Sequence, residues 1–153
     1  MDTLAYLERV KIQSEILLPL YKLLRREVGN ERAAAMLREA VREFAHGIGT
    51  AVSQSVPGTS LHKLRSLMPM FTAADALVVD PLVDSRKEFS VNIRGCKYAE
   101  YFKAIGEAEF GAMMTCEIDP PMTAALGADI TLERTQTIMS GGSHCDFRRK
   151  SSE

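Results

Sequence analysis

Three cysteines, Cys96, Cys116 and Cys145, give this chain of 153 residues its widest choice of chemistry. A thiolate is both a nucleophile and a metal ligand, whereas a buried neutral thiol behaves as a small apolar side chain. The cysteines form no CxxC pair, which argues against a zinc ribbon or a thioredoxin-like motif. Their odd number favours free thiols in a reducing compartment, so we expect a cytoplasmic protein.

The predicted surroundings of each thiol fit two roles, a reactive thiolate or a buried side chain that only packs. Cys145 stands among apolar neighbours in a predicted strand, where it needs a base or a cation to become a nucleophile. Cys96 follows Gly95 at the start of a predicted helix, whose N-terminus stabilises an anion and lowers the pKa of a thiol. Cys116 precedes Asp119 by three positions in a segment whose prolines indicate a loop. Asp119 is a candidate general base that activates water, and the alternative is a turn-forming aspartate.

Arg134 is predicted on the inward, apolar face of a strand, where an unpaired guanidinium is strongly destabilising. Its partner is either a structural carboxylate, such as Asp119 or Glu117, or the carboxylate of a small ligand. His46 stands beside the core-facing side of a predicted helix and is a candidate for reaching the sheet, or else a solvent-facing ring. His144 points away from Cys145 in a strand and is a poor base for that thiol.

Helical spacing of apolar residues dominates the first half of the chain. The pattern runs from residue 4 to 28, and Pro19 inside it is expected to kink or split the helix. Gly29 and Asn30 predict a stop followed by a start, and a second amphipathic helix covers 31–52. A short helix begins at Thr59 or Ser60 and is expected to end near Pro69.

Alternation of apolar and polar residues takes over in the second half. Strands are predicted at 76–79, bounded by Asp80-Pro81, and at 89–93, followed by helical spacing over 99–105. Residues 130–138 alternate again and predict a strand. Gly141-Gly142 predicts a two-residue hairpin turn, and residues 144–148 form the returning strand of that hairpin. We predict one α+β domain over 1–153, helical over 1–70 and with sheet plus helix over 76–149. The helical N-terminal half packs on an antiparallel sheet that ends in a C-terminal β-hairpin.

The hairpin turn also predicts which side chains share a face. It places Ile138 opposite Cys145 and Gln136 opposite Phe147, with Arg134 on the same inward face. Asp146 and Arg148 fall on the other face, and Arg148-Arg149-Lys150 is expected to be a solvated basic end.

Composition excludes several classes of protein. Hydrophobic residues make up 46% of the chain and charged residues 25%, as in a globular domain, and the net charge of -1 offers no general attraction to nucleic acid or anionic membranes. No apolar run is long enough to span a bilayer, and the N-terminus lacks the layout of a signal peptide. We therefore expect neither nucleic acid nor a membrane as a partner, and self-association through an apolar helix face stays open. A small-molecule substrate is the expected partner only through the ligand contact considered for Arg134.

Several segments of the second half resemble the L-2-amino-thiazoline-4-carboxylic acid hydrolase family in order and spacing. The helical segments around 17–20 and 29–33 agree as well, so the resemblance covers nearly the whole chain. The matching segments are 95–102 (GCKYAEYF), 105–107 (IGE), 116–119 (CEID), 132–138 (LERTQTI) and 141–148 (GGSHCDFR). One departure is Gly142, where relatives often carry an acidic residue.

The resemblance implies ring-opening hydrolysis at the C=N carbon of a cyclic amidine or thiazoline-like substrate that bears a carboxylate. The positions that carry over are Cys96, Cys116, Asp119, Arg134, Cys145, Asp146 and Arg148. In this hypothesis Arg134 holds the carboxylate, and Cys145 or Cys116 attacks as a thiolate or Asp119 activates water. Cys96, His46, Asp146 and Arg148 are further substrate-binding candidates, and no cofactor or metal is expected.

Two other functions compete with catalysis. The end of the chain, from Gly141 to Phe147, also resembles four-vinyl-reductase-like domains, which are small-ligand sensors. A non-catalytic binding or sensor domain is therefore the alternative, since one charged anchor in an apolar pocket suits capture as well as chemistry. A zinc site formed by Cys96, Cys116, Cys145 and Asp119 is the third hypothesis.

Overall fold

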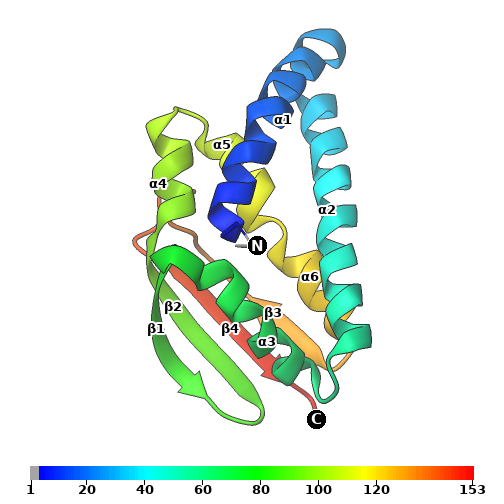
Figure 1. Cartoon of the computed structure of the whole chain (residues 1–153), viewed down its shortest axis with the longest axis vertical. Coiled ribbons are helices and arrows are strands. Elements are labelled where there is room, and N and C mark those ends of the chain that lie inside the picture. Colours follow the sequence, from blue (N-terminus) through cyan, green and yellow to red (C-terminus); the bar gives the residue numbers. More distant parts are fainter. Residues whose placement is uncertain (1–3) are drawn as a thin grey trace.

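A computed structural model describes residues 4–153 as a layer of helices packed on one face of an antiparallel sheet (Figure 1). The predicted α+β class, with a helical first half and a sheet in the second, is confirmed. No helix within the described residues is both long and apolar enough to cross a bilayer.

The helices of the first half form a long antiparallel pair and a shorter third member. Helix α1 (Tyr6–Val28) and helix α2 (Asn30–Ser55) are joined at Gly29, whose positive φ of 87° suits glycine. Helix α3 (Ser60–Thr72) begins where the Thr59 side chain accepts a hydrogen bond from the His62 backbone. These boundaries agree with the predicted turn at Gly29 and the predicted cap at residue 59.

Two prolines lie inside helices: Pro19, which was expected to kink or split its helix, does not split it, and Pro69 does not end its helix. Helix α1 continues through Pro19, and α3 continues through Pro69 to Thr72. A proline in a helix removes one hydrogen bond. The buried residues on the two sides, such as Val10 and Tyr21 in α1, need one continuous helix to reach the same core, so packing outweighs that loss.

The sheet has the strand order β1-β2-β4-β3, and all neighbouring strands are antiparallel. Its strands are β1 (Leu77–Asp84), β2 (Glu88–Cys96), β3 (Ile130–Glu133) and β4 (Cys145–Ser151). Strand β1 extends through Asp80-Pro81, which had been expected to end it. Because β1 is an edge strand, a residue without an N–H is tolerated there.

The C-terminal hairpin is wider than predicted. Strand β3 ends at Glu133, which is opposite Arg148, and residues 134–144 form a loop rather than a tight turn at Gly141-Gly142. The predicted pairs of Ile138 with Cys145 and of Gln136 with Phe147 are therefore wrong. The error is two residues, so the faces are unchanged: Cys145 and Phe147 point inward and pair with Ile93 and Val91 of β2.

Short helices connect the strands and complete the helical layer. They are α4 (Lys97–Ala104), α5 (Ala108–Gly111), the π-helical segment η2 (Ala112–Cys116) and α6 (Asp119–Leu126), and a 3-10 turn η1 (Ala73–Asp75) follows α3. Residues 119–121 had been expected to be a loop. Pro120 and Pro121 instead occupy the first turn of α6, where no backbone N–H is needed.

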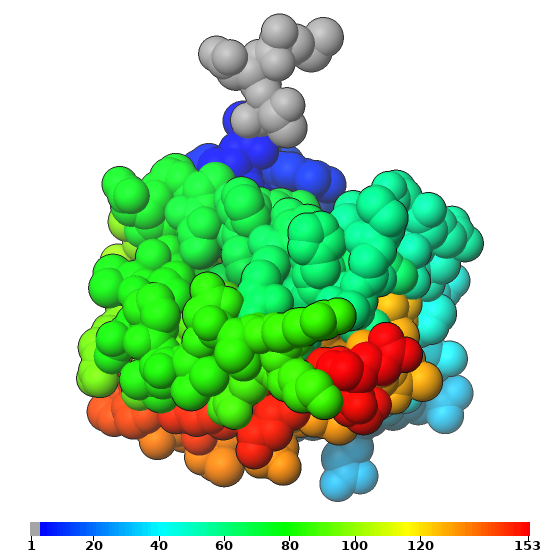
Figure 2. All heavy atoms as spheres, turned by 90° about the horizontal axis from the view of Figure 1, so that it is seen from below, coloured from blue at the N-terminus to red at the C-terminus, as the bar shows by residue number. Residues whose placement is uncertain are grey.

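The core lies between the helices and the inward face of the sheet. Figure 2 shows the molecule from below, with strands β3 and β4 (orange and red) along one edge and the first turns of α1 (dark blue) at the opposite edge. Helix α6 packs on α2 and β3, and α3 crosses over β1 and β4. The fold therefore has one sandwiched layer of side chains, and the residues that turn into it from both sides define the candidate site.

Candidate active site

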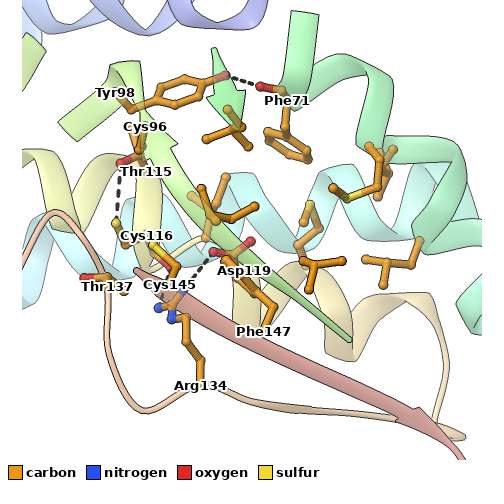
Figure 3. Close-up of a pocket in the computed structure, with 18 of the residues that line it drawn as sticks. Phe71, Cys96, Tyr98, Thr115, Cys116, Asp119, Arg134, Thr137, Cys145 and Phe147 are labelled. Atoms are coloured by element: carbon orange, nitrogen blue, oxygen red, sulfur yellow. Dashed lines mark hydrogen bonds and ion pairs between the residues drawn. The ribbon is translucent and has the colours of Figure 1, made fainter. Parts of the chain in front are cut away.

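A cavity of about 80 Å³ lies between the inward face of the sheet and the helices above it (Figure 3). It has room for several water molecules or a small guest. The wall is mostly apolar, with side chains from α3, β2 and α6 such as Leu64, Val91 and Met122. The polar lining consists of Asp119, Arg134, Arg149, Thr115 and Thr137, together with the three thiols and the side chains of Tyr6 and Tyr98.

Five of the eight candidate site residues converge on this cavity. Cys96 comes from the end of β2, Cys116 from η2, Asp119 from the first turn of α6, Arg134 from the loop after β3 and Cys145 from β4. Cys96 and Cys145 are far apart in the sequence, but both line the cavity because β2 and β4 are neighbouring strands. The tertiary fold thus builds one site from distant segments.

Arg134 and Asp119 form the ion pair that was one of the two expected arrangements. Nη1 of Arg134 donates to Oδ2 of Asp119 at 2.6 Å, and Nη2 donates to the Cys116 carbonyl at 3.0 Å (Figure 3). Burial raises the pKa of Asp119, and the Arg149 and Arg134 guanidiniums oppose that effect. Arg134 is therefore already engaged with the protein.

Burial holds all three thiols in their protonated form at neutral pH. It raises the pKa of Cys116 to about 12, and it also raises the pKa of Cys96 and of Cys145. Cys96 does cap α4, accepting a hydrogen bond from the Ala99 backbone at 3.4 Å. The expectation that the helix N-terminus lowers its pKa is nevertheless wrong, because loss of solvent outweighs the hydrogen bond.

Arg149 is a polar residue of the cavity that sequence reasoning missed. It was expected in a solvated basic end, yet it is 3% exposed and lines the cavity. Its guanidinium carbon lies 4.4 Å from the centre of the Phe147 ring, and Nη2 lies 4.0 Å from Oδ1 of Asp119. The alternation of β4 was the available signal, since Cys145 and Phe147 point inward and the next position in step is 149.

Comparison with known proteins places this site in a family. A family model described as L-2-amino-thiazoline-4-carboxylic acid hydrolase matches residues 9–148. The chain belongs to the L-2-amino-thiazoline-4-carboxylic acid hydrolase family. The match includes every candidate residue of the site, from His46 to Arg148. No curated protein sequence matches this hydrolase-family chain.

Solved structures are similar to this member of the hydrolase family in fold. The phenol-responsive sensory domain of the transcription activator PoxR with phenol has 16% sequence identity and a TM-score of 0.54, covering 99% of this chain and 76% of that chain. A trafficking protein particle complex subunit 3 from Naegleria fowleri, covalently bound to palmitic acid, has 12% identity and a TM-score of 0.48, covering 94% and 97%. The PoxR likeness supports the fold alone.

Three candidate residues of the hydrolase-family chain lie outside the cavity. His46 is exposed on α2 and contacts Thr50, so it does not reach the sheet. Asp146 accepts hydrogen bonds from the backbone of Thr135 and Gln136 and orders the loop after β3. Arg148 donates to the Val91 carbonyl and to Asn92 on the outward face. None of the three lines this cavity, because the alternation of β4 turns Asp146 and Arg148 to the other face and His46 lies on the exposed side of α2.

The zinc hypothesis finds no ligand set in this hydrolase-family chain. Among residues 4–153, no three His, Cys, Asp or Glu side chains lie close enough together to hold a metal ion. Cys96, Cys116, Cys145 and Asp119 share the cavity wall, but they are spread around it rather than gathered at one point.

Proposed function

We propose that the protein is a hydrolase that opens a small heterocycle at the C=N carbon of a carboxylate-bearing substrate. The observation that carries the proposal is the meeting of Asp119, Arg134 and Arg149 on the wall of an otherwise apolar cavity. The family description supports the reaction class. A carboxylate beside two guanidiniums, shielded from bulk water, is suited to moving a proton during hydrolysis.

Asp119 is the group best placed to act as the general base. Arg134 occupies Oδ2, whereas Oδ1 accepts no hydrogen bond from the described residues and faces Arg149 at 4.0 Å. Burial raises the pKa of Asp119, which makes its carboxylate a stronger base than an exposed one. A water molecule bound at Oδ1 would lose its proton to Asp119 as it attacks the substrate.

The proposed reaction consumes one water molecule and needs no other reagent. The water oxygen bonds to the C=N carbon while Asp119 takes one water proton, and Asp119 then passes that proton to the ring nitrogen, which restores its carboxylate. The bond from that carbon to the other ring heteroatom, sulfur in a thiazoline, then breaks with its electron pair. The remaining hydroxyl proton passes to the departing heteroatom, and the carbon becomes a carbamoyl carbonyl.

Water is favoured over a thiol as the attacking group. With the pKa of Cys116 raised to about 12 and that of Cys145 also raised, neither thiol is ionised in the free protein at neutral pH. We therefore assign Cys96, Cys116 and Cys145 to shaping the cavity wall. Thiolate attack by Cys145 or Cys116 is the competing mechanism.

The experiment compares Asp119→Asn with Glu117→Gln, using L-2-amino-thiazoline-4-carboxylic acid and mass spectrometry to detect the gain of one water molecule. Glu117 is a matched control because it is nearby, exposed, and paired with Arg38 rather than with the cavity. We expect Asp119→Asn to lower kcat by at least about 100-fold and Glu117→Gln to leave it unchanged. Cys145→Ser and Cys116→Ser should keep most of the activity. Full activity of folded Asp119→Asn would overturn the proposal.

A non-catalytic small-ligand-binding domain is the second candidate function. It is favoured by the predominantly apolar wall and the protonated thiols, and a protein of similar fold is described as a phenol-responsive sensory domain. Small ring compounds would then raise the melting temperature without being consumed. Stabilisation by phenol or the thiazoline with no product over many hours would favour this function over hydrolysis.

A further inference from the structure

We infer that Arg149 is the anion receptor of the cavity and that the ligand presents a single carboxylate to it. The inference deepens the proposed function by naming the group that recognises the ligand, and it rests on the same cavity. Arg149 is 3% exposed, and its Nε and Nη1 atoms have no hydrogen-bond partner within the described residues. Buried guanidinium donors without an acceptor are costly, so they indicate a partner that arrives from outside the chain.

The charges of the cavity favour one negative charge on the ligand. Two guanidiniums, Arg134 and Arg149, share a single carboxylate, that of Asp119, which leaves one positive charge uncompensated. Burial lowers the pKa of Arg149, as expected for a cation with insufficient compensation. A ligand monoanion would neutralise the trio and accept hydrogen bonds from Nε or Nη1 at the same time.

Arg134, which sequence reasoning favoured as the carboxylate anchor, is less suited to that role. Its Nη1 donates to Asp119 and its Nη2 to the Cys116 carbonyl, so two of its three nitrogens are already engaged in holding α6 against the loop after β3. Arg134 is better described as the residue that positions Asp119. The free donors belong to Arg149.

The remaining wall indicates what the rest of the ligand looks like. The carboxylate end lies at the Phe147 ring, over which the Arg149 guanidinium stacks at 4.4 Å. Beyond it the wall is formed by apolar side chains such as Leu64, Ile93 and Met122, and the space is about 80 Å³. The structure therefore favours a small, largely apolar monocarboxylate over a neutral compound, a dicarboxylate or a long-chain acid.

The test measures binding of 2-furoate and of its neutral amide, 2-furamide, by calorimetry, with no turnover required. Wild-type protein should bind the acid at least tenfold more tightly than the amide. Arg149→Met should abolish that preference, whereas Arg148→Met, the neighbour that points to the opposite face, should retain it. Arg149→Met should also melt at a higher temperature without ligand, because an apolar side chain of similar volume removes an uncompensated charge.

Equal binding of acid and amide by the wild-type protein, or an undiminished preference in Arg149→Met, would overturn the inference. Should Arg149→Met fail to fold, equal binding of acid and amide by the wild-type protein would still overturn the inference, and Arg149→Lys, which keeps the charge but loses the guanidinium Nε and Nη1 donors, should bind the acid at least tenfold more weakly than the wild type. The outcomes are separable from those of the hydrolase proposal. Loss of turnover in Asp119→Asn tests the chemistry, and the acid-to-amide preference of the unaltered protein tests the receptor.

A second observation, independent of the cavity, concerns the outer surface of α1. Four apolar residues, Ile12, Ile16, Leu20 and Leu23, are between 43% and 70% exposed. Their spacing of three or four residues places them in one stripe along the helix. Such a continuous apolar stripe indicates a surface that a partner covers.

We propose that a second copy of the chain covers this stripe in an antiparallel arrangement. Charged pairs stand at the two ends of the stripe: Glu8 and Arg9 precede it, and Arg26 and Glu27 follow it, all four exposed. A two-fold axis near the middle of the stripe would bring Arg9 of one copy beside the partner's Glu27, and Glu8 beside the partner's Arg26. Both contacts at each end then join an acidic to a basic side chain, so the charge pattern is complementary to an antiparallel copy of itself.

The test is sedimentation of the wild-type chain at micromolar concentration, where we expect a dimer. Ile16→Glu should yield a monomer, and Leu82→Glu, at an exposed leucine of β1 far from α1, should remain dimeric. Arg9→Glu should weaken the dimer at least tenfold, and combining it with Glu27→Arg should restore it. A monomeric wild-type chain, one that instead sediments with phosphatidylcholine vesicles, or no rescue by the charge exchange would overturn the proposal.

Discussion

Asp119 and Arg134 meet at 2.6 Å although each comes from a different structural unit, and each side chain is only 15% exposed. The pair links the first turn of α6 to the loop that follows β3. Because Arg149 approaches the same carboxylate from β4, three elements are joined at one point. The site is thus a structural junction as well as a candidate for chemistry, and the following predictions separate the two.

Removing the buried partner of Asp119 should destabilise the fold far more than removing a surface partner. Arg134→Met leaves Asp119 with only the more distant Arg149, and we expect a loss of about 2–4 kcal/mol in the free energy of unfolding. Arg38→Met breaks the exposed pair with Glu117, whose side chains are 44% and 37% exposed, and should cost less than about 1 kcal/mol. Urea denaturation measures the free energy of unfolding of both variants. Equal losses would show that the buried pair stabilises the fold no more than the exposed pair does.

The cavity thiols should react slowly in the folded protein. Because burial raises the pKa of Cys116 to about 12, its thiolate is scarce at neutral pH, and alkylation by iodoacetamide should be at least about 100-fold slower than for free cysteine. Cys96 and Cys145 should also be slow. Peptide mass spectrometry reads each site separately, with the urea-unfolded chain as control. Rapid modification of Cys145 in the native state would instead revive the thiolate mechanism.

Two helical glycines should respond to alanine with opposite signs. A Cβ at Gly111 would lie 2.4 Å from Cγ of Phe102, a buried ring, so Gly111→Ala should lower stability by about 1–3 kcal/mol. A Cβ at Gly47 meets no atom within 4 Å, and Gly47→Ala in the middle of α2 should raise stability by about 0.5–1 kcal/mol. Thermal melts check both. A neutral Gly111→Ala would mean that α5 shifts easily against α4.

Asp146 should contribute stability that disappears in acid. Although burial raises it, hydrogen bonds from Thr135 and Gln136 bring the pKa of Asp146 down to about 2. Because this folded pKa lies below the unfolded value of about 3.9, the contribution is complete above about pH 5 and is lost progressively as the pH falls towards 2. The stability difference between wild type and Asp146→Asn should therefore narrow between pH 4 and pH 2. A difference that stays constant across this range would contradict the assignment.

The family, the α+β class and five residues that line the cavity followed from the sequence, because periodicity and motif spacing are local properties. The alternation of β2 placed Val91 and Ile93 in the core, and the helical spacing of α2 did the same for Leu37 and Val41. The same local reasoning failed at Pro69 and Pro120, where a proline was taken as a boundary. At Pro69, packing of the flanking residues outweighs the lost hydrogen bond, so the helix continues. At Pro120, the helix begins, because a residue in the first turn has no intrahelical partner for a backbone N–H and proline is tolerated there.

By itself, the sequence determined which residues can do chemistry and on which face of each strand they lie. Only the tertiary structure decided that Arg134 is engaged with Asp119, that burial raises the pKa of the thiols, and that Nε and Nη1 of the buried Arg149 find no partner within the described residues. The physical reason is that pKa values and unpaired donors depend on solvent exclusion and on partners from distant segments. Neither quantity exists until β4 lies beside β2 and α6 closes over them.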